Sequence, residues 1–127
     1  MIFDKVQHVA IIVSDCEKSK EFYVNKLGLK IIYELERPER QSRFVYLDAG
    51  NLIIELCCFP NPPKRLEWPE AAGLRHLAFE MDNFDAVIKR LNEMGLKTEH
   101  IRTDGRTGKR YTFFHDPDRL PLEISEK

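Results

Sequence analysis

The stretch that decides the fold is Val6-Gln7-His8-Val9-Ala10-Ile11-Ile12-Val13, and it returns at residues 74–79 as Leu74-Arg75-His76-Leu77-Ala78-Phe79. Its β-branched residues and period-2 alternation predict a strand. His8 and His76 hold the same place in the two copies, 68 residues apart, and Glu55 and Glu123 each follow their histidine by 47 residues. A repeat of this kind predicts two copies of one structural unit and a site to which both contribute.

Each copy is predicted to be a βαβββ module. The first should contain strands at 6–13, 29–35, 43–47 and 52–59, with a helix that begins at a Ser14–Glu17 capping box and ends at Gly28. The second should contain strands at 74–79, 97–101, 110–114 and 120–125, with a helix that is capped by Asp82 or Asn83 and ends at Gly95. We expect a single domain over 1–127, with module one at about 4–59, a proline-rich linker at about 60–72 and module two at about 73–127.

Composition limits the function classes. The 127 residues are 43% hydrophobic and 32% charged with a net charge of −1, a globular balance without the basic field that nucleic acid or an anionic membrane would need. The N-terminal residues lack a signal-peptide pattern, and no run approaches the length of a membrane span, so a cytoplasmic location is expected. The three cysteines show no disulfide or zinc spacing and are expected to be reduced thiols.

The histidines and glutamates favour a metal site. Glu55 lies in Leu52-Ile53-Ile54-Glu55-Leu56-Cys57, where nothing else is polar, and a carboxylate taken out of water needs a proton, a cation or a metal. A core imidazole bonded to a backbone carbonyl, and an exposed Glu123, are the plain alternatives for each residue alone. Their matched positions favour a shared set of two nitrogen and two oxygen ligands, His8, Glu55, His76 and Glu123.

This order of motifs resembles the vicinal oxygen chelate superfamily, which includes glyoxalase I, methylmalonyl-CoA epimerase, extradiol dioxygenases, fosfomycin-resistance proteins and bleomycin-binding proteins. The resemblance covers nearly the whole chain. It rests on His8-Val9-Ala10-Ile11, Phe22-Tyr23 before Leu27-Gly28, Ile54-Glu55-Leu56, Gly73-Leu74-Arg75-His76-Leu77-Ala78-Phe79, and Asp116-Pro117-Asp118 before Leu122-Glu123. It implies an α+β fold in which two tandem modules form a curved mixed sheet, a partly open barrel around a metal cavity.

The four-ligand set is similar to that of the glyoxalase-I-like branch. It implies a lyase or isomerase that uses one nickel, zinc, cobalt, manganese or iron ion per site and acts through an enediolate on a thiol adduct of a 2-oxoaldehyde or a related carbonyl compound. Glu123 or Glu55 would be the catalytic base. By the same resemblance, the partner is a small-molecule substrate and the assembly a homodimer, with no role for nucleic acid or membrane.

Substrate residues and alternatives stay open at this stage. Arg43, Lys109 and Arg110 could bind anionic parts of a substrate, although surface solubility is the more common role for most such cations. The same scaffold could instead support an epimerase or an iron(II) dioxygenase. It could also be a binding protein without catalytic activity, which would purify free of metal.

Overall fold

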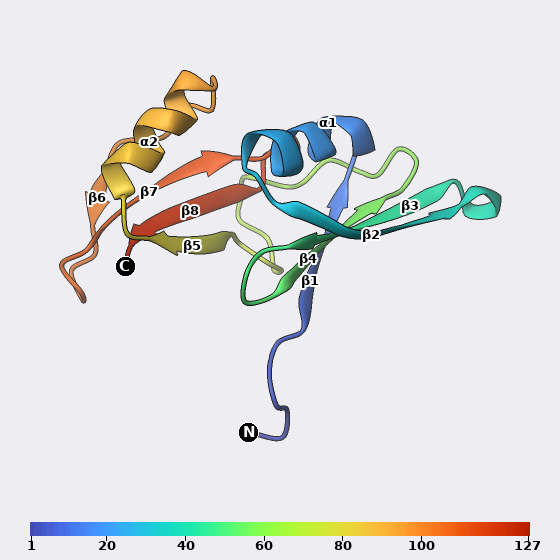
Figure 1. The fold of residues 1–127 in the computed structure, drawn as a ribbon, viewed down its shortest axis with the longest axis horizontal. Helices are drawn as coiled ribbons and strands as arrows, with labels where there is room; N and C mark the ends of the chain where they lie inside the picture. Colours follow the sequence, from blue (N-terminus) through green and yellow to red (C-terminus); the bar gives the residue numbers. More distant parts are fainter. The chain divides into compact units, whose positions relative to one another are not determined.

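The computed structural model describes all of residues 1–127 and divides them into two compact units, Met1–Lys64 and Arg65–Lys127 (Figure 1). The first contains β1 (His8–Val13), α1 (Cys16–Lys20), the π-helical segment η1 (Glu21–Lys26), β2 (Lys30–Arg37), the 3₁₀ turn η2 (Pro38–Arg40), β3 (Ser42–Asp48) and β4 (Ile53–Cys58). The second contains β5 (Leu77–Met81), α2 (Phe84–Glu93), β6 (Arg102–Thr103), β7 (Arg110–His115) and β8 (Pro121–Glu126). None of the helices has the length and apolar character that a membrane crossing requires.

Each unit forms its own four-stranded mixed sheet, in the order β1-β4-β3-β2 and β5-β8-β7-β6. In both sheets the first and last strands of the unit pair in parallel, and the remaining neighbours are antiparallel. The predicted α+β class and the two tandem modules are therefore confirmed. Neither sheet closes into a barrel.

The core of each unit follows from strand alternation. On β4, Ile54 and Leu56 are buried, and Leu122 and Ile124 are their counterparts on β8. Burying an Ile or Leu side chain contributes about 1.5–3 kcal/mol. Because successive side chains point to opposite faces, this burial turns the glutamate between each pair toward the other face of its sheet.

Two predicted elements were wrong in detail. The first helix begins with Asp15 as its N-cap, whose carboxylate accepts from the Lys18 N–H at 3.1 Å, so the Ser14–Glu17 capping box was incorrect. The strand predicted at 97–101 is a two-residue pairing at Arg102–Thr103. The Thr112 hydroxyl donates to the carbonyls of Glu99 and His100, at 2.8 and 3.3 Å, and so occupies acceptors that a longer ladder would use.

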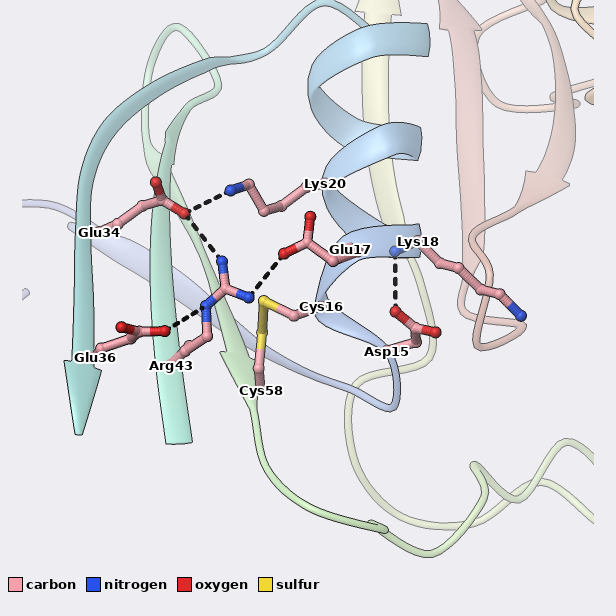
Figure 2. The surroundings of a disulfide bond; sticks show 9 residues. All are labelled: Asp15, Cys16, Glu17, Lys18, Lys20, Glu34, Glu36, Arg43 and Cys58. Carbon is pink, nitrogen blue, oxygen red and sulfur yellow. Dashed lines mark hydrogen bonds and ion pairs between the residues drawn. A yellow bond between two sulfur atoms is a disulfide. The ribbon is translucent and has the colours of Figure 1, made fainter. Parts of the chain in front are cut away.

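The expectation that all cysteines are reduced was also wrong. Cys16, at the start of α1, forms a disulfide with Cys58, the last residue of β4, and only the buried Cys57 remains a free thiol. The sequence did not reveal this disulfide because 42 residues separate the two cysteines along the chain. The fold brings them together where α1 packs beside β4 (Figure 2).

Arginine networks join helix to sheet at equivalent places in the two units. In the first, the Arg43 guanidinium of β3 lies among the carboxylates of Glu17, Glu34 and Glu36, at 2.7, 3.6 and 3.5 Å (Figure 2). Glu17 belongs to α1, so this contact bridges helix and sheet.

In the second unit, Arg110 of β7 bonds Asp85 of α2 at 3.0 Å and Glu126 of β8 at 2.8 Å, and its guanidinium lies 5.0 Å from the centre of the Phe84 ring. The Arg110 side chain lowers the pKa of Asp85 and of Glu126 through its hydrogen bonds. Their ordinary pKa values are 3.8 and 4.5, and in the folded protein both lie lower. The ionised carboxylates therefore stabilise the fold above those ordinary values, and this contribution is lost as pH falls through the lowered ones.

We predict that the protein is less stable to urea at pH 3 than at pH 7, and that the double variant Asp85→Asn, Glu126→Gln loses less stability over that interval. The physical reason is that the amides cannot be protonated in this range. Urea unfolding at the two pH values, followed by circular dichroism, gives the comparison. An equal loss in variant and parent would show that these carboxylates do not contribute to the acid response.

We further predict one reactive thiol per chain, from Cys57, when the protein is unfolded in denaturant without reductant, and three after reduction. Since the bond closes a loop of roughly 40 residues, reduction should lower the free energy of unfolding by about 2–4 kcal/mol. Thiol titration and urea unfolding measure these quantities, with Cys57→Ser as the control. Three free thiols before reduction would contradict the disulfide.

Candidate functional site

Each unit brings its histidine and glutamate into contact. Parallel pairing sets Glu55 of β4 opposite Ala10 of β1, and Glu123 of β8 opposite Ala78 of β5. The histidine lies two residues before the alanine, on the same face of the sheet. The Nε2 atom of His8 is 3.3 Å from Oε2 of Glu55, and the Nε2 atom of His76 is 3.0 Å from Oε2 of Glu123.

In the first unit, both members of the pair have a further partner. Nδ1 of His8 lies 2.8 Å from Oε1 of Gln7, which can accept a proton carried by that nitrogen. Tyr46 lies directly opposite Glu55 on β3. Hydrogen bonding to the Glu55 carboxylate, burial and the Glu55 charge raise the pKa of Tyr46.

Cys57 shares the surroundings of Glu55. Burial, and then the charge of Glu55, raise the pKa of this thiol to about 11. The thiol is therefore protonated at neutral pH, and a reactive thiolate is not expected here.

In the second unit, His76 and Glu123 have no further side-chain hydrogen-bond partner of this kind. Nδ1 of His76 is buried and has no hydrogen-bond partner, and the edge of the Phe113 ring packs against the imidazole with ring centres 5.3 Å apart. Phe113 also occupies the position opposite Glu123, where Tyr46 stands in the first unit. Glu123 therefore has His76 as its only side-chain partner.

A cavity of about 810 Å³ opens beside this second pair, within the Arg65–Lys127 unit. Its lining includes His76, Glu123 and the cavity-facing side of β7, with Tyr111, Phe113 and His115. The segment 65–75 forms another wall, and Arg65 braces it by donating to the carbonyls of Leu74 and Arg75. The Trp68 side chain in this segment is 82% exposed.

Two further groups outside the predicted site residues, Arg102 and His115, line the cavity. Arg102 lines it, with its guanidinium 5.8 Å from the Phe113 ring centre and 3.3 Å from Glu99. Sequence analysis did not identify Arg102 because it placed strand β6 at residues 97–101. His115 faces Glu99 at 4.0 Å, and burial followed by the Arg119 charge lowers its pKa, so its imidazole is neutral at pH 7.

The expected substrate cations lie elsewhere. Arg43 and Arg110 are bound to the carboxylates that join helix to sheet, and these contacts occupy the donors that a substrate anion would need. Lys109 belongs to the turn before β7, where its backbone N–H donates to Thr107 at 3.3 Å. Neither Lys109 nor Arg110 lines the cavity of the second unit.

The donor chemistry of the two pairs fits a divalent metal. An imidazole nitrogen beside a carboxylate oxygen is a common ligand combination for zinc, nickel, cobalt, manganese and iron. Each pair supplies two donors, and no group of three or more His, Cys, Asp or Glu side chains is assembled. One pair alone provides fewer protein ligands than the three or four of a typical site.

Comparison with known proteins shows a consistent relationship. Residues 5–124 match the family model described as glyoxalase/bleomycin resistance protein/dioxygenase superfamily. The uncharacterized protein YwkD of Bacillus subtilis (strain 168) is 54% identical over the full length of both chains, and the uncharacterized protein YaeR of Escherichia coli (strain K12) is 48% identical over 97% of this chain and 96% of its own. The mitochondrial methylmalonyl-CoA epimerase of Homo sapiens is 31% identical over 90% of this chain and 68% of its own.

Solved structures agree. The glyoxalase family protein from Enterococcus faecalis superposes with a TM-score of 0.92 at 45% identity, over 99% of this chain and all of the other. The fosfomycin resistance protein FosX from Listeria monocytogenes, complexed with Mn(II) and sulfate, shares the fold with a TM-score of 0.74 at 19% identity, over all of this chain and 94% of its own. The repeated modules, the matched His–Glu pairs and these similarities together show that the chain belongs to the glyoxalase/bleomycin resistance protein/dioxygenase superfamily.

Proposed function

We propose that this protein is a metal-dependent enzyme of the glyoxalase I type, a lyase or isomerase that moves a proton beside a carbonyl group. The observation that carries the proposal is the pair of equivalent contacts between imidazole Nε2 and carboxylate Oε2, 3.3 Å in one unit and 3.0 Å in the other. Two equivalent half-sites on a duplicated scaffold support one shared function better than two separate structural roles.

Under this proposal, His8, Glu55, His76 and Glu123 together hold one divalent ion. Nickel, zinc, cobalt, manganese and iron all accept this ligand set, and metal availability decides among them. When bound, the ion would act as a Lewis acid that stabilises negative charge developing on a substrate oxygen. A bound cation would also explain why Glu55 stands on a strand whose other side chains are apolar.

The catalytic work of the chain itself is proton transfer. A carboxylate must remove the proton from the carbon beside the carbonyl and return it to the neighbouring carbon, which passes the substrate through an enediolate. We assign this step to Glu123 or Glu55. The position of Glu123 in the lining of the cavity supports Glu123.

The proposed substrate is a thiol adduct of a 2-oxoaldehyde, converted to a 2-hydroxyacyl thioester. A cavity of about 810 Å³ lies within the range that accommodates drug-sized ligands, whereas a free 2-oxoaldehyde would leave most of it to water. The aromatic side chains of Tyr111 and Phe113 and the cation of Arg102 would contact the part of the substrate that does not react.

An epimerase is the second candidate. The 31% identity to human methylmalonyl-CoA epimerase favours it, and epimerisation also removes a proton beside a carbonyl, here that of a thioester, but returns it to the same carbon on the opposite face. The two candidates differ in the substrate that fills the cavity, while the carboxylates have the same role.

A cytoplasmic location and a homodimeric assembly complete the proposal. The Cys16–Cys58 disulfide counts against the location, because cytoplasmic thiols are kept reduced. The oxidation state of the cysteines in freshly lysed cells tests that part, and sedimentation velocity tests the dimer.

We predict that the purified protein loaded with nickel, cobalt or zinc converts the hemithioacetal of methylglyoxal, and that the metal-free protein does not. Glu123→Gln should lower kcat at least ~100-fold, because a positioned general base contributes about that much. The exposed carboxylate Glu80 on β5 provides a matched control, since Glu80→Gln should leave kcat unchanged. Thioester formation is followed by ultraviolet absorbance.

Activity assays with other substrates separate the alternatives. Exchange of the methylmalonyl-CoA α-proton with deuterated solvent, without glyoxalase turnover, would favour the epimerase. Oxygen consumption with catechols would favour a dioxygenase. A protein that purifies without metal, takes none up and binds small molecules equally well after His76→Ala would contradict an enzymatic role.

A further inference from the structure

Strand β7 turns three side chains toward the cavity of the second unit, those of Tyr111, Phe113 and His115. Alternate residues of a strand share a face, so the three form one row. Phe113 lies directly opposite Glu123 on β8, and His115 lies opposite Pro121, two residues before Glu123. Residues in this diagonal arrangement are roughly 7–8 Å apart. A substrate in the cavity can therefore lie within reach of both the His115 imidazole and the Glu123 carboxylate.

The charges around His115 suit a group that takes up and releases a proton. Burial, followed by the Arg119 charge, lowers the pKa of His115. The charges of Glu99, Glu67 and Asp116 act in the opposite direction. The imidazole is therefore neutral at pH 7, and the neighbouring carboxylates can stabilise an imidazolium once the ring accepts a proton.

No structural contact within the protein accounts for the His115 ring. Its only ion-pair partner is Glu99, whose carboxylate is 4.0 Å from Nε2 and so beyond hydrogen-bond range. The corresponding position on β3 in the first unit is Asp48, which accepts the backbone N–H of Gly50 at 2.8 Å and stabilises a turn. The second unit thus has an imidazole available to a ligand where the first unit has a turn residue.

The proposed isomerisation must move two protons. One passes from carbon to carbon, and a carboxylate carries it. The other passes from oxygen to oxygen, because the hemithioacetal hydroxyl becomes the thioester carbonyl while the former carbonyl becomes a hydroxyl. Epimerisation needs no transfer between oxygens, because its carbonyl stays on the same carbon.

We propose that His115 is the catalytic residue that carries this second proton between the two substrate oxygens. This inference rests on the proposed function. After the carboxylate has taken the carbon-bound proton, the C–H electron pair forms the carbon–carbon double bond of the enediolate, and the former carbonyl oxygen carries the negative charge. The neutral imidazole accepts the hydroxyl proton and donates it to that oxygen. The charge left on the former hydroxyl oxygen re-forms a carbonyl as the carboxylate returns its proton to the adjacent carbon, and His115 is neutral again.

Tyr111 is the other polar side chain in the β7 row, on the opposite side of Phe113. A neutral imidazole has a basic lone pair and takes up a proton near neutral pH, which a phenol does not. This difference favours His115 as the proton carrier.

Turnover of the glutathione hemithioacetal of methylglyoxal in deuterated water, by the cobalt-loaded full-length protein, tests the role. His115→Gln should slow thioester formation roughly 100-fold, because a positioned acid–base group contributes about that much. The carboxylate still exchanges the carbon-bound proton, so deuterium at the aldehyde carbon of the remaining substrate should rise relative to the thioester formed. His100→Gln is the matched control, because His100 is exposed and does not line the cavity.

The ratio of exchange to conversion separates catalysis from structure, because a disturbed fold lowers both rates together. An unchanged ratio in His115→Gln would overturn the assignment. A ratio that rises in Tyr111→Phe instead would give the role to Tyr111 and also overturn it.

Two measurements besides turnover complete the test. Titration of cobalt(II) alone should give the same affinity for His115→Gln and the parent, and a weaker affinity would make His115 a metal ligand instead of a proton carrier. In the metal-free protein, the ring resonances of His115 should shift when the hemithioacetal is added, while those of His100 stay in place. An unresponsive His115 ring would disprove its contact with the substrate.

Failure of this inference is distinguishable from failure of the proposed function. A parent protein that converts no hemithioacetal with any of the metals contradicts the proposed function, and the oxygen-to-oxygen transfer with it. A parent that converts the hemithioacetal no faster than His115→Gln contradicts this inference alone.

Discussion

Parallel pairing between the first and last strands of each unit is the constraint on which the candidate site depends. It sets Ala10 beside Glu55 and Ala78 beside Glu123, and the strand period then brings His8 and His76 to the same carboxylates. A shift of one residue in either register would turn the glutamate toward the core. The buried Ile54, Leu56, Leu122 and Ile124 oppose that shift, because it would exchange apolar burial for a buried charge.

The two arginine networks join the helix of each unit to the sheet of the same unit. Arg43 and Arg110 occupy corresponding strands and bind carboxylates on the helix of their own unit. Ion pairs at this degree of exposure contribute little individually. Together these ion pairs fix the position of the helix against the sheet. The sheet in turn fixes the strand register on which the site depends.

Sequence reasoning succeeded where one periodicity and one repeat carried the information. The matched spacing of His and Glu gave the two modules and predicted which residues meet, because strand pairing in a duplicated unit leaves few alternatives. It failed where contacts depend on distant chain segments. The Cys16–Cys58 disulfide, the Thr112 hydroxyl that limits β6 and the carboxylates that bind Arg43 all come from tertiary placement that no local pattern encodes. The difference between Tyr46 and Phe113 can be read in the sequence, but only the strand registers show that these two residues lie opposite Glu55 and Glu123.

The central claim is that both His–Glu pairs hold a single ion, and X-ray absorption at the cobalt edge of the fully loaded protein, combined with the metal-to-protein ratio, tests it most directly. The account predicts one cobalt per chain with two imidazole scatterers in its coordination sphere. Two cobalt ions per chain with one imidazole each, or no bound cobalt, would contradict it.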